Sequence, residues 1–419
     1  MTLDTRPDEL LGPVEEEGFS EEQLSPSEWV RAHLFSGPLD TMFTLIFAAI
    51  FVVAVSWLVR YLVESDFTIL RVNLTNLMVG RFPREQIWRP AVAMLMAGGA
   101  IGLGAGLVRA AARDRAKQAG LPFETTGVLG LLRRFWPIAA FLLLALLLAG
   151  TITPWLVVGA TLASAALLAL LGRAIPASLR RWGWASVAGL LIGSYLIMIG
   201  GGVGYDGWGG LYLNIFLTVA GIALAFPLGM MLALGRRSSL PALKISSITY
   251  IEFIRGVPLI TLLLLGAFAL GFFLPDALQP SRTTRILIAI ALFEAAYIAE
   301  VVRGGFAAVP RGQVEAAQAV GLSPWKQTRL IVLPQALRAT IPAMVGQFIS
   351  LFKDTTLVVV VALTDILGMS QNANAQPDFF GQGLHRVTLP FVALAFWVGS
   401  YTMSREARRL ERRLGVGER

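Results

Sequence analysis

Ionisable side chains interrupt several apolar stretches in the second half of this 419-residue sequence. A charged group in hydrocarbon is unfavourable unless it is paired or hydrated, so such groups usually face a bundle interior or a watery cavity. Carboxylates bind ammonium groups, and Lys or Arg binds carboxylates, so these side chains offer transient binding of a small zwitterion. The candidate pathway residues are Arg255, Gly256, Pro258, Glu294, Lys353 and Asp354.

Two helix breaks are expected among these residues. Gly256-Val257-Pro258 interrupts one apolar run, because Pro lacks a backbone donor and Gly permits unusual dihedral angles. Lys353 and Asp354 are expected to interrupt a later run in the same way, and carbonyl groups freed at such breaks can face a cavity. Arg255 or Lys353 is then the candidate partner of the zwitterion's carboxylate. Its ammonium group would meet Glu294, Asp354 or an exposed carbonyl.

Each charged residue also has a structural interpretation. Lys353 and Asp354 can neutralise one another. Glu300 and Arg303 are spaced i, i+3 and can form an ion pair at a helix end. Arg255 can connect its helix to a cytoplasmic loop instead of binding a ligand, so the sequence leaves both interpretations open.

Residue counts exclude several kinds of catalytic site. The chain has no Cys and only His33 and His385, so it offers no thiol chemistry, no Cys-based metal site and no histidine cluster. The phosphate-binding pattern GxxxxGK[ST] does not occur, which excludes ATP hydrolysis by the usual phosphate loop. We therefore expect no enzyme activity, no metal and no cofactor in this chain.

The composition indicates a helical membrane protein. Hydrophobic residues make up 55% of the chain and charged residues 15%, whereas a soluble domain of this length needs a more polar surface. A helix crosses the hydrocarbon with roughly 20 apolar residues, and this rule predicts about ten spans in an all-α polytopic protein. The expected spans are 41–60, 90–108, 135–150, 154–172, 184–200, 211–235, 246–274, 285–302, 339–365 and 388–404.

Basic residues set the expected orientation. The formal net charge of +8 is gathered at the ends of apolar runs, which is typical of membrane anchoring and not of nucleic-acid binding. If successive spans cross the membrane in alternating directions, the basic clusters all fall on one side of it. That side is then the cytoplasmic one, and both termini lie there. One connection differs, because residues 61–88 would be periplasmic yet contain Arg71, Arg81 and Arg84. The clusters comprise Arg109, Arg113, Arg115, Lys117, Arg133, Arg134, Arg173, Arg180, Arg181, Arg236, Arg237, Lys244, Arg405, Arg408, Arg409, Arg412 and Arg413.

Changes in composition divide the chain into regions. The expected regions are an acidic cytoplasmic tail with an interfacial helix (1–40), an accessory membrane region (41–204), a core with polar residues in its spans (205–410) and a cytoplasmic C-terminus (411–419). The interfacial helix should begin at Ser25, because Glu28 three residues later completes a capping box. In the accessory region Gly98, Gly102 and Gly106 are spaced four apart, a pattern that predicts close helix packing.

The cytoplasmic segment 304–338 is too polar to cross a membrane and is rich in helix formers. A first short helix is expected from about Gln313 to Val320, stopped by Gly321 in the left-handed conformation. Ser323 should cap a second helix, which Pro334 ends or kinks. The segment is therefore predicted to form a rigid helical elbow with a shallow, alanine-rich surface.

This elbow resembles the EAA loop of binding-protein-dependent ABC importer permeases. The match consists of Glu315-Ala316-Ala317, Gly321, Ile331 and Leu333-Pro334. Further segments are similar to the polar amino acid branch of that family, and the long N-terminal half resembles the larger permeases of alphaproteobacterial general amino acid and glutamate/glutamine/aspartate/asparagine systems. These segments are Gly210-Leu211-Tyr212, Tyr250 to Leu259, Ala296 to Gly305 and Lys353 to Leu357.

The resemblance implies a type I ABC importer permease with a MetI-like core. Its expected partners are a homologous permease chain, two cytoplasmic ATPase subunits that bind ATP and Mg, and a periplasmic amino-acid-binding protein. The elbow would be the coupling helix that sits in a cleft of the ATPase. The implied coupling residues are Glu315, Ala316, Ala317, Gly321, Ser323, Lys326, Arg329, Leu333 and Pro334.

A different class of function uses some of the same residues. In a secondary transporter driven by an ion gradient, Glu252, Glu294 and Asp354 would be proton or ion sites. Transport without an ATPase would distinguish this alternative from the ABC importer. The sequence does not specify which amino acids are carried or whether the two permease chains are identical.

Overall fold

A computed structural model describes residues 25–122, 127–200, 203–205, 207–269, 273, 275 and 279–415 of the chain. It divides into two compact units, Met1–Ser65 and Asp66–Arg419. The expected acidic tail, residues 1–24, lies outside the described residues, as do residues 416–419 of the expected C-terminal segment.

The first unit contains helices α1 (Pro26–Leu34) and α2 (Pro38–Glu64). The predicted capping box is confirmed, because the Ser25 hydroxyl accepts from the Glu28 amide at 3.4 Å and the Glu28 carboxylate accepts from the Ser25 amide at 2.9 Å. Helix α2 is apolar along its whole length and buries no residue within the chain. An apolar helix of this kind needs lipid or another protein around it.

The second unit is helical throughout its described residues, apart from one isolated bridge between Gly210 and Asp365. This confirms the predicted all-α class. Its helices are α3 (Thr68–Val79), α4 (Trp88–Gln118), α5 (Val128–Arg134), α6 (Trp136–Leu148), α7 (Thr153–Ala174), α8 (Arg180–Ile199), α9 (Gly210–Arg236), α10 (Pro241–Gly256), α11 (Leu259–Leu264), α13 (Arg282–Ala308), α14 (Arg311–Ala319), α15 (Pro324–Gln327), α16 (Leu333–Asp354), α17 (Ile366–Asn374) and α18 (His385–Leu414).

The described residues contain seven helices that are long and apolar enough to cross a membrane, and an eighth span if α10 and α11 count together. The expected span 135–150 corresponds to the shorter apolar helix α6. The expected span 285–302 lies within α13, whose apolar run carries Glu294 and Glu300. The polytopic helical architecture is thus confirmed, while the count of about ten is not.

Helix α4 packs against α7 and α8, and small residues bring the backbones close. A Cβ atom added at Gly102 would overlap the carbonyl of Ala165, and one at Gly106 would overlap that of Ala169. At Gly98 the same atom would lie 2.6 Å from the Thr161 side chain. The predicted packing role of these glycines is therefore confirmed.

The change Gly102→Leu is expected to separate α4 from α7 and to lower the free energy of unfolding by about 1–3 kcal/mol, the usual effect of overpacking. Denaturant or thermal unfolding of the chain in nanodiscs measures this effect. Gly159→Leu on α7 is the matched control, because nothing lies within 4 Å of a Cβ atom there. Equal stability of the two variants would contradict the proposed close packing.

The core is organised around α13, which contacts α9, α10, α11 and α16. A Cβ atom at Gly229 on α9 would lie 2.8 Å from the carbonyl of Ala295, and one at Gly305 on α13 would lie 2.6 Å from that of Ala336. The backbones of these helices are therefore in direct contact at Gly229 and Gly305, with no side chain between them.

A buried polar junction joins the start of α9 to the start of α17. The Asn214 amide donates to Thr355 at 3.0 Å and to the Asp365 carboxylate at 3.1 Å, and its carbonyl accepts from the Ile366 amide at 3.1 Å. Asn214 and Asp365 are both 0% exposed. Buried polar groups paired in this way fix one relative position of their helices.

The connection 61–88, which carried unexpected arginines, folds largely as α3. Its Ile69 and Leu77 are fully buried in a cluster shared with α6, α17 and α18. The Arg84 guanidinium donates to the Asn76 side chain at 2.9 Å. This segment is therefore an integral part of the second unit and not a plain linker.

Candidate functional site

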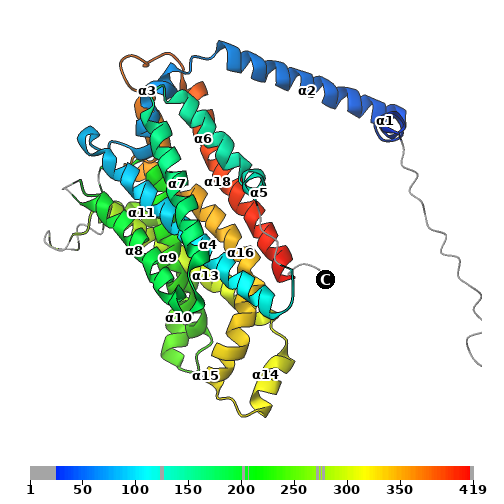
Figure 1. Cartoon of the computed structure of the whole chain (residues 1–419), viewed down its shortest axis with the longest axis vertical. Helices are drawn as coiled ribbons and strands as arrows, with labels where there is room; N and C mark the ends of the chain where they lie inside the picture. The colour runs from blue at the N-terminus through cyan, green and yellow to red at the C-terminus, as the bar shows by residue number, and fades with distance from the viewer. Residues whose placement is uncertain are drawn as a thin grey trace, which may run out of the picture. The chain divides into compact units, whose positions relative to one another are not determined.

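The elbow consists of α14 and α15, which Figure 1 shows together at one end of the Asp66–Arg419 unit. Helix α14 ends as predicted, with Gly321 in the left-handed region at φ +75°. The Gly321 amide donates to the Gln318 carbonyl at 2.9 Å, and the Leu322 amide to that of Ala317 at 3.1 Å. These two bonds form a Schellman motif, which makes the turn rigid.

Ser323 occupies the position before α15, but the predicted side-chain cap is wrong. Its hydroxyl makes no cap hydrogen bond. The Gln327 amide instead donates to the Ser323 carbonyl at 2.9 Å, and the Gln327 side chain donates to the Leu322 carbonyl at 2.6 Å. Trp325 and Lys326 are exposed, so water can satisfy their amides in place of the hydroxyl.

The helix does not end at Pro334. The sequence predicted that Pro334 would either end or kink this helix, and the first of these outcomes is wrong. Residues Thr328–Val332 form a π-helical turn, and α16 continues directly from Leu333. Pro334 lacks the amide hydrogen that an α-helix needs at its position, and a wider turn just before it relieves the clash with the preceding carbonyl. A continuous helix from Pro324 to Val361 therefore connects the elbow to the membrane.

Most predicted coupling residues lie on the elbow surface. Glu315, Ala316, Gly321, Ser323, Lys326, Arg329 and Pro334 are exposed, and Leu333 is partly buried. Ala317 is only 4% exposed and packs inward, so it is not part of the shallow, alanine-rich surface that the sequence predicted. Two apolar residues of the elbow that sequence reasoning did not single out are also exposed, Val320 at 75% and Trp325 at 62%. The sequence signal that could have found Trp325 is a large aromatic residue within a polar loop.

The elbow is attached firmly to the membrane helices. The Gln335 side chain donates to Gln313 at 3.2 Å, which ties α16 to α14. Val332 and Ala336 belong to a buried cluster with Phe306 near the end of α13. The elbow is thus in direct contact with α16 and lies beside the end of α13.

The predicted break at Gly256-Val257-Pro258 is confirmed. Helices α10 and α11 meet there at an angle of 102°, and Pro258 starts α11. A cavity of about 590 Å³ lies beside the break. It is lined by Phe253, Val257, Thr261, Leu262, Leu264, Leu265, Phe268 and Ala269.

The expectation that Lys353 and Asp354 break their span in the same way is wrong. The α-helix ends at Asp354, but the chain continues as a tighter helix over Thr355–Val361 within one span. A charged pair removes no backbone donor, unlike proline, so it changes the helix type without bending the helix.

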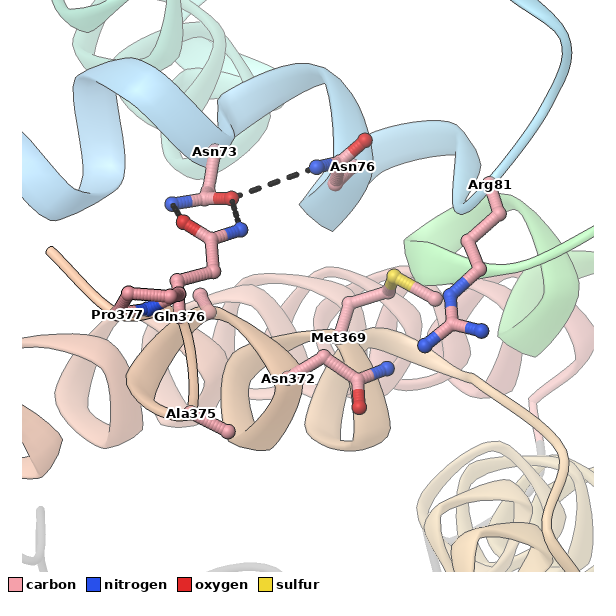
Figure 2. Close-up of a pocket in the computed structure, with 9 residues that line it drawn as sticks. Asn73, Asn76, Arg81, Met369, Asn372, Ala375, Gln376 and Pro377 are labelled. Atoms are coloured by element: carbon pink, nitrogen blue, oxygen red, sulfur yellow. Dashed lines mark hydrogen bonds between the residues drawn. The ribbon is translucent and has the colours of Figure 1, made fainter. Parts of the chain in front are cut away.

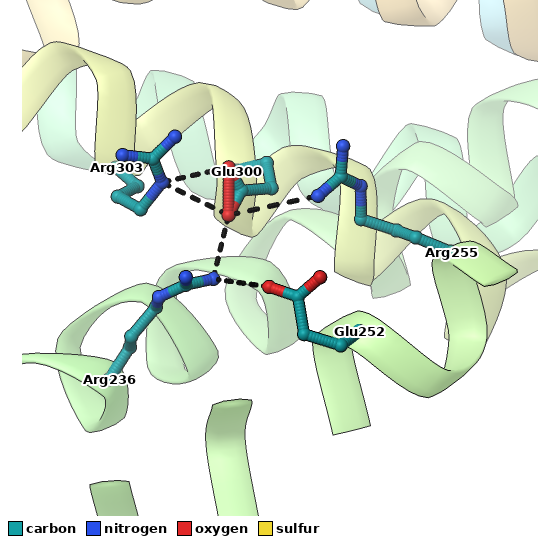
Figure 3. Close-up of polar contacts among 5 residues, drawn as sticks. All are labelled: Arg236, Glu252, Arg255, Glu300 and Arg303. Carbon is teal, nitrogen blue, oxygen red and sulfur yellow. Dashed lines mark hydrogen bonds and ion pairs between the residues drawn. The ribbon is translucent and has the colours of Figure 1, made fainter. Parts of the chain in front are cut away.

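Glu300 is the centre of an ion network at the ends of α9, α10 and α13 (Figure 3). Its carboxylate lies 2.7 Å from Arg236, 2.8 Å from Arg303 and 3.9 Å from Arg255. Arg236 also reaches Glu252 at 3.2 Å. The structural interpretation of Glu300 and Arg303 is therefore confirmed, and the network extends it to three helices.

Arg255 lies at the edge of this network. Besides its contact with Glu300, its guanidinium lies 5.7 Å from the centre of the Tyr297 ring. Both partners are on α13, so Arg255 holds the end of α10 against that helix. Sequence could not reveal these partners, because they lie more than forty residues away along the chain.

Glu294 is the most deeply buried ionisable residue of the predicted pathway. It lies on α13 at 2% exposure, and its Oε1 atom has no hydrogen-bond partner among the described residues. Within the described part of the chain no salt bridge joins Lys353 to Asp354. No group of three or more His, Asp or Glu residues that could hold a metal occurs among the described residues.

Comparison with known proteins supplies an independent finding. Residues 225–416 match the family model of the binding-protein-dependent transport system inner membrane component. The glutamate/glutamine/aspartate/asparagine transport system permease protein BztC of Rhodobacter capsulatus is 35% identical over 94% of this chain and 94% of its own length. The inner membrane amino-acid ABC transporter permease protein YhdY of Escherichia coli is 43% identical over 50% of this chain, which covers 57% of the length of YhdY. A crystal structure of an amino acid ABC transporter with histidines aligns with 49% of this chain and 92% of that chain, at 29% identity and a TM-score of 0.44.

The similarity to BztC extends over the N-terminal half as well as the core. The matched family region contains the elbow, the ion-network residues on α10 and α13 and the polar residues of α13 and α16. These relatives are permease subunits and not enzymes. The chain belongs to the family of binding-protein-dependent transport system inner membrane components, as a membrane-spanning permease of the amino acid ABC transporter type.

Proposed function

We propose that this chain is the translocating subunit of an ATP-driven importer that brings polar L-amino acids into the cytoplasm. Glutamate, glutamine, aspartate and asparagine are the proposed cargoes, in line with the name of BztC. The observation that carries the proposal is the rigid elbow, whose exposed surface projects from a helix continuous with the membrane span. A transporter driven by ions needs no such surface.

The proposed assembly contains a second, homologous permease chain, two cytoplasmic ATPase subunits and a periplasmic binding protein. ATP and Mg bind to the ATPase subunits. The chain lies in the inner membrane with the elbow and both termini in the cytoplasm, because the basic clusters gather on that side. Val320 and Trp325 fill the ATPase cleft, while Glu315, Lys326 and Arg329 offer charges at its rim.

Alternating access follows from the way the elbow is attached. When ATP draws the ATPase subunits together, the elbow moves with them and carries α16 through the continuous helix. Because α16 touches α13 at Gly305 and α13 touches α9 at Gly229, the three helices move as one body. The ion network around Glu300 keeps α10 attached to that body.

The cargo pathway is proposed to run past the break at Gly256 and Pro258 and the polar residues of α13 and α16. Glu294 and Asp354 are the proposed partners of the cargo ammonium group, since the Glu294 Oε1 atom has no hydrogen-bond partner among the described residues. Lys353 is the proposed partner of a carboxylate. Arg255 is assigned to the ion network instead.

A second candidate function is transport driven by an ion gradient. The observation that favours it is the buried carboxyl group of Glu294, whose Oε1 atom has no hydrogen-bond partner in the described part of the chain and which is therefore a candidate proton site. In that case transport would need neither the elbow nor an ATPase.

Co-purification of the tagged chain with its ATPase tests the proposal. We expect the ATPase to be captured by the natural chain, and to be lost when Glu315 to Pro334 is deleted or when Trp325→Glu places a charge on the exposed apolar surface. Size-exclusion profiles of the chain alone control for folding. Undiminished capture by both variants would exclude the elbow as the coupling element.

A further inference from the structure

A cavity of about 390 Å³ lies between α3 and α17, away from the proposed cargo pathway. It is formed by two parts of the sequence, the segment around α3 and the segment from α17 to the residues after it. Its lining residues are Asn73, Asn76, Arg81, Met369, Asn372, Ala373, Ala375, Gln376 and Pro377. We propose that this cavity is a binding site for a small molecule that is held by its carboxylate group.

The charge of the cavity is positive and uncompensated. Figure 2 shows Arg81 extending from beyond the end of α3 toward Met369 and Asn372 on α17. Arg81 has no ion pair and no hydrogen bond to any described residue, and no Asp or Glu lines the cavity. A guanidinium group presents a planar set of donors that matches a carboxylate, so an anionic group is the ligand that completes this surface.

Paired amides hold one wall of the cavity in a fixed position. Asn73 donates to Gln376 at 3.1 Å and accepts from it at 2.7 Å, as the paired dashed lines in Figure 2 show. Asn76 donates to Asn73 at 3.3 Å and accepts from Arg84 at 2.9 Å. A polar wall preorganised in this way binds a ligand without the cost of ordering its own side chains.

Asn372 remains available on the opposite wall. Its side-chain amide has no hydrogen-bond partner among the described residues and lines the cavity below Arg81. A free amide can both donate and accept, so it can meet the carboxylate or the side-chain amide of the ligand. Arg81 and Asn372 are therefore the two groups that the proposed ligand would engage.

The shape of the cavity favours a small molecule over a protein surface. Small-molecule sites are concave and typically enclose about 300–1,000 Å³, whereas stable protein interfaces are broad and bury over roughly 1,000 Å². The cavity is concave, and its volume lies within the range of small-molecule sites. A bound amino acid would contact both α3 and α17 and would stabilise the junction between them, whether or not the chain is an importer.

Isothermal titration of the full-length chain in nanodiscs with L-glutamate and L-glutamine tests the site without any partner protein. We expect both to bind, and Arg81→Gln to weaken the binding of each by about tenfold or more, since it removes a charge-assisted hydrogen bond. Asn372→Ala should weaken binding as well. Arg81→Lys should retain part of the affinity, because it keeps the charge.

One control separates this site from other sources of binding. Arg71→Gln removes an exposed arginine of the neighbouring helix α3 that does not line the cavity, and it should leave affinity unchanged. The proposal is overturned if the natural chain binds neither ligand, or if Arg81→Gln and Asn372→Ala bind as tightly as the natural chain. If Arg81→Gln reduces capture of the binding protein by the tagged chain but leaves the affinity for the ligand unchanged, the cavity is a protein docking site. That result would also overturn the proposal.

Discussion

Glu300→Gln is expected to lower the free energy of unfolding of the permease by about 2 kcal/mol, because it leaves three arginines without their shared partner. Removing one member of a buried ion pair usually has an effect of about 3–5 kcal/mol, and the partial exposure of Arg255 and Arg303 reduces it here. After the change only Glu252 remains to balance Arg236. Unfolding of the chain in nanodiscs, followed by intrinsic fluorescence, measures the loss.

Glu252→Gln is the matched control for this prediction. Glu252 is 55% exposed and its ion pair within the described residues is with Arg236 alone, so its loss is expected to change stability by less than about 1 kcal/mol. In the assembled transporter, Glu300→Gln should also weaken the link between α10 and α13 and reduce the stimulation of ATP hydrolysis by cargo. Equal effects of the two changes would contradict a network centred on Glu300.

Gly321→Val is expected to abolish most ATPase binding while leaving the membrane helices folded. A β-branched residue at φ +75° is strained by about 1–2 kcal/mol, so the Schellman turn would open and α14 would lose its fixed angle to α15. The coupling surface made by Val320 and Trp325 would then lose its shape. Capture of the ATPase by the tagged chain measures the loss, and the unfolding midpoint of the chain alone reports on the membrane helices.

Gly312→Ala provides the control for the turn. Gly312 lies within α14, has an ordinary helical backbone and has nothing within 4 Å of a Cβ atom, so alanine should preserve or slightly favour the helix. Normal ATPase capture by Gly321→Val would show that the turn geometry does not matter for coupling.

Features encoded by glycine and proline could be predicted from the sequence. The turn at Gly321 and the break before Pro258 depend on the backbone of these residues alone, and both are observed. Residue type decides the turn and the break without reference to distant partners. The spacing of Gly98, Gly102 and Gly106 predicted close packing but not its partner at Gly102, the Ala165 carbonyl.

Features that depend on distant contacts could not be predicted. Arg255 looked available to a ligand because Glu300 is remote in sequence, and only the fold brings the two together. The burial of Ala317 and the exposure of Trp325 likewise depend on how the elbow folds back on itself. The sequence left open whether Pro334 ends or kinks the helix, because the π-helical turn that precedes it has no simple sequence signal.

Uptake by proteoliposomes tests the central claim most directly. The full-length chain, its permease partner, its ATPase and its binding protein would be reconstituted, and accumulation of radiolabelled L-glutamate would be measured with internal or external ATP and with an imposed ion gradient. We predict uptake that requires ATP on the ATPase side together with the binding protein, and that is lost with Gly321→Val. Uptake driven by an ion gradient without the ATPase would contradict the assignment of this chain to an ATP-driven importer.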